Sequence, residues 1–208
     1  MRHWRTLLVG VGLSSLLGCT GMTSSECELA DWQAVGFEDG SLGHSADVFA
    51  RHRKGCAKHD VAPDFTAYRA GREAGLREYC QPARGFREGA RGGEYLGVCP
   101  PDLEDAFFER YEEGRALYEL EYAVRSTHQK LAHKQQRMKD IEIRLAENVA
   151  ATLAGDTPGE ERARLLVETR QLTEERMALT GDVERLEREL RLREDQLSDH
   201  RAQMMTRL

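Results

Sequence analysis

The cysteine at position 19 has the sequence surroundings of a thiol that is modified with lipid. Two basic residues, Arg2 and Arg5, are followed by an apolar run over residues 6–17. This run ends in Leu16 and Leu17, and Gly18 comes directly before Cys19. Residues of these kinds form the cleavage site of a bacterial lipoprotein signal peptide, after which the thiol receives a diacylglyceryl group. The run is about a dozen residues long, whereas a bilayer-spanning helix needs about 20. We therefore expect residues 1–18 to be removed and Cys19 to carry the membrane anchor.

Four further cysteines, Cys27, Cys56, Cys80 and Cys99, lie in the first half of the chain. An even number of cysteines in an exported chain favours disulfides over free thiols. Four cysteines allow three pairings. We favour Cys27 with Cys56 and Cys80 with Cys99, because sequence neighbours close the smaller loops, and we expect each bond to contribute roughly 3 kcal/mol.

His52, Cys56 and His59 offer a competing interpretation as metal ligands. Their spacing of four and three residues places them on one face if the segment is helical, and His44 is available as a fourth ligand. Imidazole and thiolate are the ligands that zinc prefers. A cysteine in a disulfide cannot also supply a thiolate, so the sequence predicts no metal site.

Acidic side chains beside Trp32 give a weak indication of catalysis. Asp31, Glu38 and Asp39 resemble the paired carboxylates of glycosidases, but helix capping and solvation explain them more simply. The chain contains no Gly-x-Ser-x-Gly, His-Glu-x-x-His or phosphate-loop motif. We predict neither an enzyme nor a cofactor.

The charge balance argues against a nucleic-acid partner. The chain holds 30 Lys and Arg against 36 Asp and Glu, a net charge of −6. Most of the acidic excess lies in residues 101–208. Nucleic-acid phosphates require a basic face, whereas this distribution is that of solvated helix surfaces.

A weak repeat combines an aromatic residue with two glycines at helical spacing. Its copies are Trp32, Gly36, Gly40; Tyr68, Gly71, Gly75; Phe86, Gly89, Gly93; and Tyr111, Gly114, where Tyr118 replaces the second glycine. Steps of three or four residues place each set on one helix face. Interior glycine costs a helix about 1 kcal/mol relative to alanine, so the pattern needs a reason. One explanation is that short helices cross tightly at these glycines. The other is that the glycines form the bottom of a groove for a small ligand or glycan, with Trp32, Tyr68 or Phe86 at its sides.

Many separated blocks of the first half together carry a resemblance to a known family. They are Cys27, Asp31-Trp32, Gly36, Asp39-Gly40, Cys56-Ala57-Lys58-His59, Pro63-Asp64, Tyr68-Arg69-Ala70-Gly71-Arg72, Gly75-Leu76, Tyr79-Cys80, Gly85-Phe86, Gly89, Tyr95-Leu96-Gly97-Val98-Cys99-Pro100, Tyr111 and Gly114-Arg115. In this order they resemble the DUF2799 family of Gram-negative lipoproteins, over roughly residues 27 to 120. The resemblance implies an envelope address and supplies no reaction.

The predicted fold is all-α, in three parts after the signal peptide. Residues 19–26 form a lipidated polar tether, residues 27–101 a small disulfide-stapled domain, and residues 102–208 two long helices. Within the domain, Asp64 caps a helix to about Cys80, and a shorter one spans residues 85–90.

The long helices follow heptad patterns on either side of a break at residues 154–159. Asp102 is the expected N-cap of the first. The seam positions are Leu117, Leu120, Val124, Thr127, Leu131, Lys134, Met138, Ile141, Leu145, Asn148 and Thr152, then Leu165, Thr169, Leu172, Arg176, Leu179, Val183, Leu186, Leu190, Arg193, Leu197, His200 and Met204. We predict an antiparallel coiled-coil hairpin.

These expectations describe a lipoprotein on the periplasmic face of a membrane. Thr20 follows the lipidated cysteine in place of the aspartate that retains lipoproteins in the inner membrane, which favours the outer membrane. The hairpin is the expected surface for an envelope protein partner. The sequence is compatible with a monomer and with self-association of two hairpins into a four-helix bundle.

Overall fold

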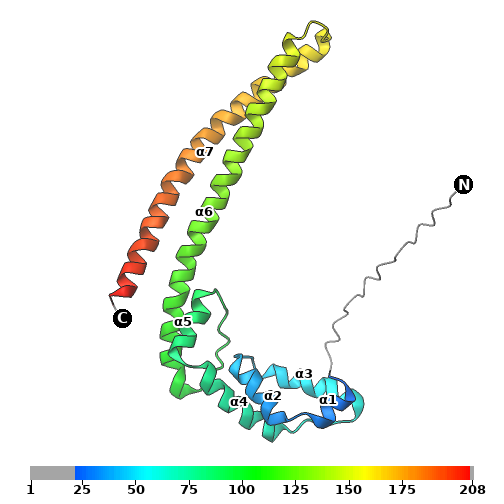
Figure 1. The fold of residues 1–208 in the computed structure, drawn as a ribbon, viewed down its shortest axis with the longest axis vertical. Coiled ribbons are helices and arrows are strands. Elements are labelled where there is room, and N and C mark those ends of the chain that lie inside the picture. The colour runs from blue at the N-terminus through cyan, green and yellow to red at the C-terminus, as the bar shows by residue number, and fades with distance from the viewer. Residues whose placement is uncertain (1–21, 207–208) are drawn as a thin grey trace, which may run out of the picture. The chain divides into compact units, whose positions relative to one another are not determined.

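The computed structural model describes residues 22–206, and Cys19 and the predicted signal peptide lie outside them. The described residues form seven α-helices and one 3-10 helix, with no strand (Figure 1). These elements are α1 (Ser24–Leu29), α2 (Trp32–Ser41), α3 (Asp47–Cys56), η1 (Ala57–His59), α4 (Phe65–Tyr79), α5 (Pro82–Ala90), α6 (Pro101–Leu153) and α7 (Gly159–Met205). The prediction of an all-α fold is confirmed for this part of the chain. Within residues 22–206, no helix is both long and apolar enough to cross a membrane.

The chain divides into two compact units, Met1–Tyr79 and Cys80–Leu208. This division differs from the predicted boundary after residue 101, because α5 packs against the beginning of α6 and belongs with it.

Local capping fixes the helices of the first unit. Thr23 and Glu26 form a capping box at the start of α1. The predicted tether is therefore shorter than expected, since residues 24–26 are helical. Asp31 accepts hydrogen bonds from the backbone at the start of α2, and Asp64 accepts one from the Ala67 amide at 2.9 Å, as predicted for α4.

In the second unit, proline rather than aspartate begins the long helix. Pro101 occupies the first turn of α6 and Pro100 the cap, where Asp102 was predicted. Proline suits this position because its fixed φ is already helical and its missing N–H would be unpaired there. Pro82 begins α5 in the same way.

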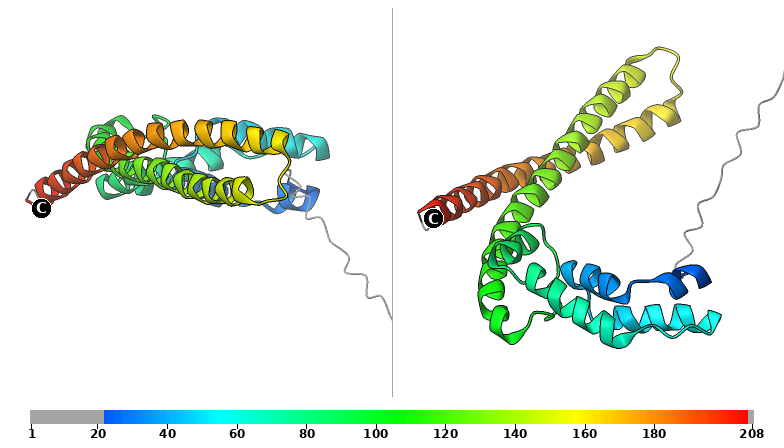
Figure 2. Two further views of the ribbon diagram at one scale, coloured as in Figure 1. Left: turned by 90° about the horizontal axis from the view of Figure 1, so that it is seen from above. Right: turned by 60° about the horizontal axis from the view of Figure 1, so that its bottom comes forward.

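Helices α6 and α7 lie side by side and run in opposite directions (Figures 1 and 2). Most predicted seam positions are buried or partly buried, and Leu131, Leu186 and Leu190 form a core cluster. Arg176 is an exception and is exposed. The long arginine side chain keeps its charge in water at little cost.

Both disulfides have the expected pairing. Cys27 is bonded to Cys56 in the first unit, and Cys80 to Cys99 in the second. Each bond joins a cysteine before the first helix of a packed pair to a cysteine before the second. Cys27, Cys56, Trp32 and Tyr68 together form the small core of the first unit.

Helices α2 and α4 touch through their backbones at the predicted glycines. A methyl group added to Gly40 would lie 2.4 Å from the carbonyl oxygen of Arg72, and one added to Gly75 would lie 2.1 Å from that of Phe37. Gly36 and Gly71 are equally close to the opposite helix. No side chain fits at these positions, so tight helix crossing accounts for the glycines.

Helices α5 and α6 repeat this contact. Methyl groups added to Gly85, Gly89 and Gly114 would lie 2.1–2.3 Å from carbonyl oxygens of the facing helix. The predicted third copy of the repeat, with Gly89 and Gly93, is therefore corrected to Gly85 and Gly89. Gly93 lies beyond the end of α5, which the sequence pattern alone did not locate.

The two helix pairs are copies of one structural unit. Gly36-Phe37-x-Asp39-Gly40-x-x-Gly43 corresponds to Gly85-Phe86-x-Glu88-Gly89-x-x-Gly92. Gly43 and Gly92 have φ angles of 71° and 78°, and the rings of Tyr79 and Tyr118 fill the space that their side chains would need. Shared contacts of this kind identify a duplication that includes both disulfides.

We expect Gly75→Ala to destabilise the first unit by roughly 1 to 3 kcal/mol, because the added methyl group forces two backbones apart. Denaturant unfolding of a protein that begins at residue 19, followed by the fluorescence of Trp32, measures this, since the other tryptophan is Trp4. Gly181→Ala is the matched control. Nothing lies within 4 Å of its added methyl group, and Gly181 lies in the second unit, so the Trp32 transition should stay that of the unmodified protein. Equal effects at both glycines would contradict the packing argument.

Candidate functional site

The carboxylate of Asp39 is the centre of a buried polar cluster in the first unit. His44 Nδ1 lies 3.1 Å from Oδ1, and His52 Nε2 lies 3.0 Å from Oδ2. The hydroxyl of Tyr68 donates to Oδ2 at 2.9 Å. These side chains come from α2, the turn after it, α3 and α4. Asp39 is 8% exposed and Tyr68 is 2% exposed, so the cluster links three helices through one carboxylate.

The surroundings of Asp39 favour its ionised form. Burial by itself raises the pKa of the carboxyl group, but hydrogen bonds from His44, Tyr68 and His52, with the charge of His52, outweigh burial and lower the pKa below its usual value. Burial, the hydrogen bond to Asp39 and the charge of Asp39 raise the pKa of Tyr68. Tyr68 therefore stays a hydrogen-bond donor, and Asp39 stays an acceptor.

Glu88 occupies the position of Asp39 in the second copy and is also buried, at 5% exposure. Its partners are different. The Nε atom of Arg91 donates to Oε2 at 2.7 Å, and Arg84 Nε lies 3.5 Å from Oε1. Phe107 occupies the position of Tyr68 and has no hydroxyl group to donate. Arginine cations thus replace the tyrosine and histidines of the first copy.

The turns that follow α2 and α5 are also held alike. The Nη2 atom of Arg72 donates to the carbonyl oxygen of His44 at 2.8 Å. In the second copy, the hydroxyl of Tyr111 donates to the equivalent carbonyl oxygen, that of Gly93, at 2.9 Å. Both copies therefore place a hydrogen-bond donor at the same position, but the donor is a guanidinium group in the first copy and a hydroxyl group in the second.

The residues of the alternative metal site do not converge on a common point. Cys56 is in a disulfide, His52 contacts Asp39, and His59 Nε2 donates to the carbonyl oxygen of Met22 at 3.3 Å. Over residues 22–206, no group of three or more His, Cys, Asp and Glu side chains is arranged to hold a metal ion. The carboxylate of Asp31 caps the start of α2, whereas Asp39 lies near the end of the same helix. The two acids therefore do not have a shared role.

The aromatic residues of the repeat serve mainly as packing. Trp32 and Tyr68 are buried in the core of the first unit, and the four glycines beside them contact backbone. Phe86 is partly exposed, and the guanidinium of Arg110 lies over its ring at 5.3 Å. These contacts favour tight crossing over a glycine-floored ligand groove.

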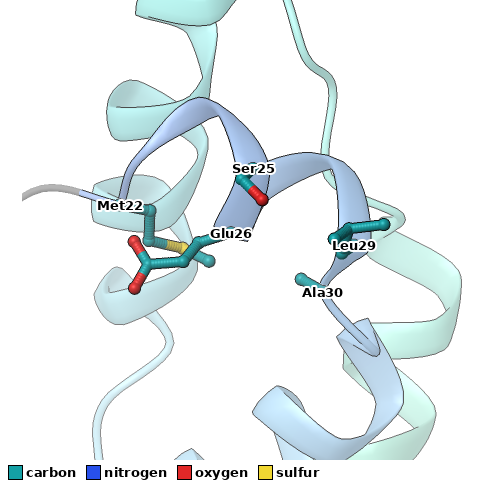
Figure 3. Close-up of a pocket in the computed structure, with 5 residues that line it drawn as sticks. All are labelled: Met22, Ser25, Glu26, Leu29 and Ala30. Carbon is teal, nitrogen blue, oxygen red and sulfur yellow. The ribbon is translucent and has the colours of Figure 1, made fainter.

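A shallow open pocket of about 430 Å³ lies at the amino-terminal end of the described chain. It is lined by Met22, Ser25, Glu26, Leu29 and Ala30, with Met22 and Glu26 at one end and Leu29 and Ala30 at the other (Figure 3). The pocket lies on α1 and holds no cluster of catalytic groups. Leu29 is 82% exposed beside it.

Sequence reasoning missed the role of Asp39 and did not consider Glu88. The available signal was the recurrence of an acid before the second glycine in Gly-Phe-x-Asp-Gly and Gly-Phe-x-Glu-Gly. Acidic residues are rarely buried without a partner, so an acid on a glycine-packed face indicates a local polar network.

We expect acid to weaken the first unit through Asp39. Because the folded pKa is lowered, the stabilisation is present above the unfolded value of about 3.9 and is lost as the pH falls through the folded pKa. Asp39→Asn should reduce stability at neutral pH by roughly 1 to 3 kcal/mol and flatten this acid dependence. Denaturant unfolding at several acid pH values, followed by Trp32 fluorescence, measures both effects.

Glu88→Gln is the control for this prediction. It changes the equivalent carboxylate in the second unit, so the acid dependence of the Trp32 signal should remain that of the unmodified protein. An Asp39→Asn protein with an unchanged acid dependence would show that another group controls the stability of the first unit.

Comparison with known proteins agrees with the resemblance in the first half. Residues 31–116 match the DUF2799 family, which is described as a protein of unknown function. No curated protein and no solved structure matches the chain. The matched range extends from the cap of α2 into α6 and covers both copies of the glycine-packed helix pair. Residues 31–116 of this chain therefore belong to the DUF2799 family.

Proposed function

We propose that this protein is a lipoprotein on the periplasmic face of the outer membrane, with a structural or protein-interaction role in the cell envelope. Lipid on Cys19 is the anchor, and α6 and α7 form a coiled-coil hairpin that reaches a protein partner. The single observation that carries the interaction role is the long pair of helices, which extends far beyond the compact, disulfide-stapled part of its unit.

The length of α6 and α7 supports a role in reaching. Helix α6 has 53 residues and α7 has 47. At about 1.5 Å per residue, they extend for roughly 70 to 80 Å. This span greatly exceeds what is needed to cover α5, which has nine residues.

Charged pairs between the helices support one fixed register. Arg137 and Arg144 donate to Glu175 and Glu168, each at 2.8 Å. Lys134 donates to Asp182 at the same distance, so this seam lysine has a partner on α7. Exposed pairs of this kind add little stability, but they distinguish one register from its alternatives.

Buried polar residues between α6 and α7 also favour one register of the two helices. Asn148 is 1% exposed, and its Nδ2 atom donates to the hydroxyl of Thr169 at 3.5 Å. A shift by one heptad would separate these groups and leave the asparagine without its partner. Polar seam residues commonly fix register in coiled coils at a cost in stability.

Exposed apolar side chains flank the loop that joins the two helices. They are Val149 and Leu153 on α6, and Leu166 and Val167 on α7. Both sides of the loop thus present apolar surface at the end of the helix pair. We propose this end, the tip of the hairpin, as the contact with a protein partner.

A photo-crosslinking residue at position 153 tests the tip in living cells. We expect it to form a discrete crosslinked band with one envelope protein, because Leu153 is largely exposed and does not support the seam. The matched control carries the same residue at Leu192, which is also exposed on the hairpin but distant from the loop. Equal bands at both positions, or none at position 153, would contradict a contact at the tip.

Cys19→Ala tests the anchor separately from the fold. We expect the protein to leave the membrane fraction, because roughly 0.8 kcal/mol per buried methylene is lost with the acyl chains. Both disulfides and the helical circular-dichroism signal should persist in the exported protein. Loss of both in the same protein would show that the anchor and the fold are not independent.

A further inference from the structure

A concentration of cations lies on α3 and η1, in the first unit. We call residues 51–59 the basic segment. Four of the seven Lys and Arg residues between positions 22 and 79 lie in it, and no Asp or Glu does. The four are Arg51, Arg53, Lys54 and Lys58. A chain with a net charge of −6 does not predict such a local positive excess.

The cations of the basic segment project into solvent without acidic partners. All four are exposed, and none forms an ion pair with an Asp or Glu among residues 22–206. Exposed arginines elsewhere, such as Arg69 and Arg137, do pair with acids. The cations of this segment are therefore available to an anionic partner.

The fold determines which way these cations face. Val48 and Cys56 are the buried residues of α3, and the ring of Phe49 packs on that of Tyr68 at 4.7 Å. Lys54 lies on the side of α3 turned away from this packing, Arg51 lies beside the packed face, and Lys58 is exposed in η1. The helix thus directs its apolar side to the core and its cations outward.

The beginning of the described chain lies against the basic segment. His59 Nε2 donates to the carbonyl oxygen of Met22 at 3.3 Å, and the sulfur atoms of Cys56 and Met22 are 4.0 Å apart. The disulfide between Cys27 and Cys56 fixes this neighbourhood. Cys19 is three residues before Met22, and three residues span at most about 11 Å.

An apolar side chain stands near the same end of the unit. Leu29 is 82% exposed, and it lines the open pocket with Met22, whose sulfur is the one beside Cys56 (Figure 3). Glu26 is the charged residue that lines the same pocket. Apolar side chains such as Leu29 can add to the binding of a basic surface in the head-group region of a bilayer.

We propose that the basic segment binds the anionic phospholipid head groups of the membrane that holds Cys19. The proposal rests on the lipid anchor proposed above, because a short connection to Cys19 brings these cations within reach of the bilayer. Attraction to an anionic surface falls off over about 10 Å at ordinary salt, a distance comparable to that connection. The acyl chains and the basic segment then act as two joint signals for membrane attachment.

Vesicle sedimentation tests the proposal with a protein that lacks its own lipid. The probe is the chain from residue 19 onward carrying Cys19→Ser. The vesicles are either pure phosphatidylcholine or phosphatidylcholine and phosphatidylglycerol in equal parts. We expect binding to the anionic vesicles alone, and weaker binding as salt increases. Equal binding to neutral vesicles, or none to anionic ones, would overturn the proposal.

Lys54→Gln with Lys58→Gln removes two exposed cations that support no packing. We expect roughly 25-fold weaker binding to the anionic vesicles, about fivefold for each cation. The matched control is Lys130→Gln with Lys139→Gln, two exposed lysines of α6 without acidic partners, which changes the net charge equally. This control should bind like the unsubstituted probe. An equal loss in the control would show that only net charge matters and would overturn the assignment to the basic segment.

Soluble glycerophosphate, matched in phosphate concentration to the anionic lipid, distinguishes a membrane surface from a site for free phosphate. It should not release the bound protein, and complete release would overturn the choice of a lipid surface. Mass spectrometry of the native protein tests lipidation of Cys19 independently. A lipidated protein whose probe ignores anionic vesicles refutes this inference alone. An unlipidated Cys19 refutes the proposed anchor, whatever the vesicles show.

Discussion

Direct backbone contact between glycine-faced helices is the constraint on which the compact parts of this protein depend. At Gly36, Gly40, Gly71 and Gly75, an added methyl group would meet the opposite backbone at 2.4 Å or less. Helices this close bury little side-chain volume, so each unit has a small core and gains correspondingly little from apolar burial. The disulfides compensate for this, because each one closes the chain around its helix pair. A buried acid at such a contact has little access to water, so it needs hydrogen-bond or ion-pair partners nearby.

The two copies of the glycine-packed helix pair provide different partners for the buried acid. Asp39 and Glu88 lie at equivalent positions, but Tyr68 in the first copy corresponds to Phe107 in the second. Where the hydroxyl is present, it joins two histidines around the carboxylate; where it is absent, Arg91 donates a hydrogen bond and Arg84 forms a longer ion pair. Arginine remains charged at any ordinary pH, whereas histidine does not. The two copies therefore share their packing and differ in their electrostatics.

Short sequence signals predicted most of the helices, whereas contacts between residues far apart in the sequence were not predicted. Asp64 and the break near Gly155 located helix ends because capping and helix-breaking residues act within short segments. The repeat was misplaced at Gly93 because glycine spacing alone does not show where α5 ends. The cluster at Asp39 was missed because His44 reaches it through a turn and His52 through a separate helix. Such contacts require the path of the backbone, which single-sequence patterns do not contain.

Helix α6 joins two kinds of packing in one continuous rod. Near its start, Gly114 contacts the backbone of α5, and further along, Leu131 is buried with Leu186 and Leu190 of α7. No break separates the two regions, since the helix is uninterrupted from Pro101 to Leu153. A proline or glycine linker would uncouple the proposed hairpin from the stapled helix pair. Without one, the glycine contact with α5 and the packing against α7 lie on the same continuous helix.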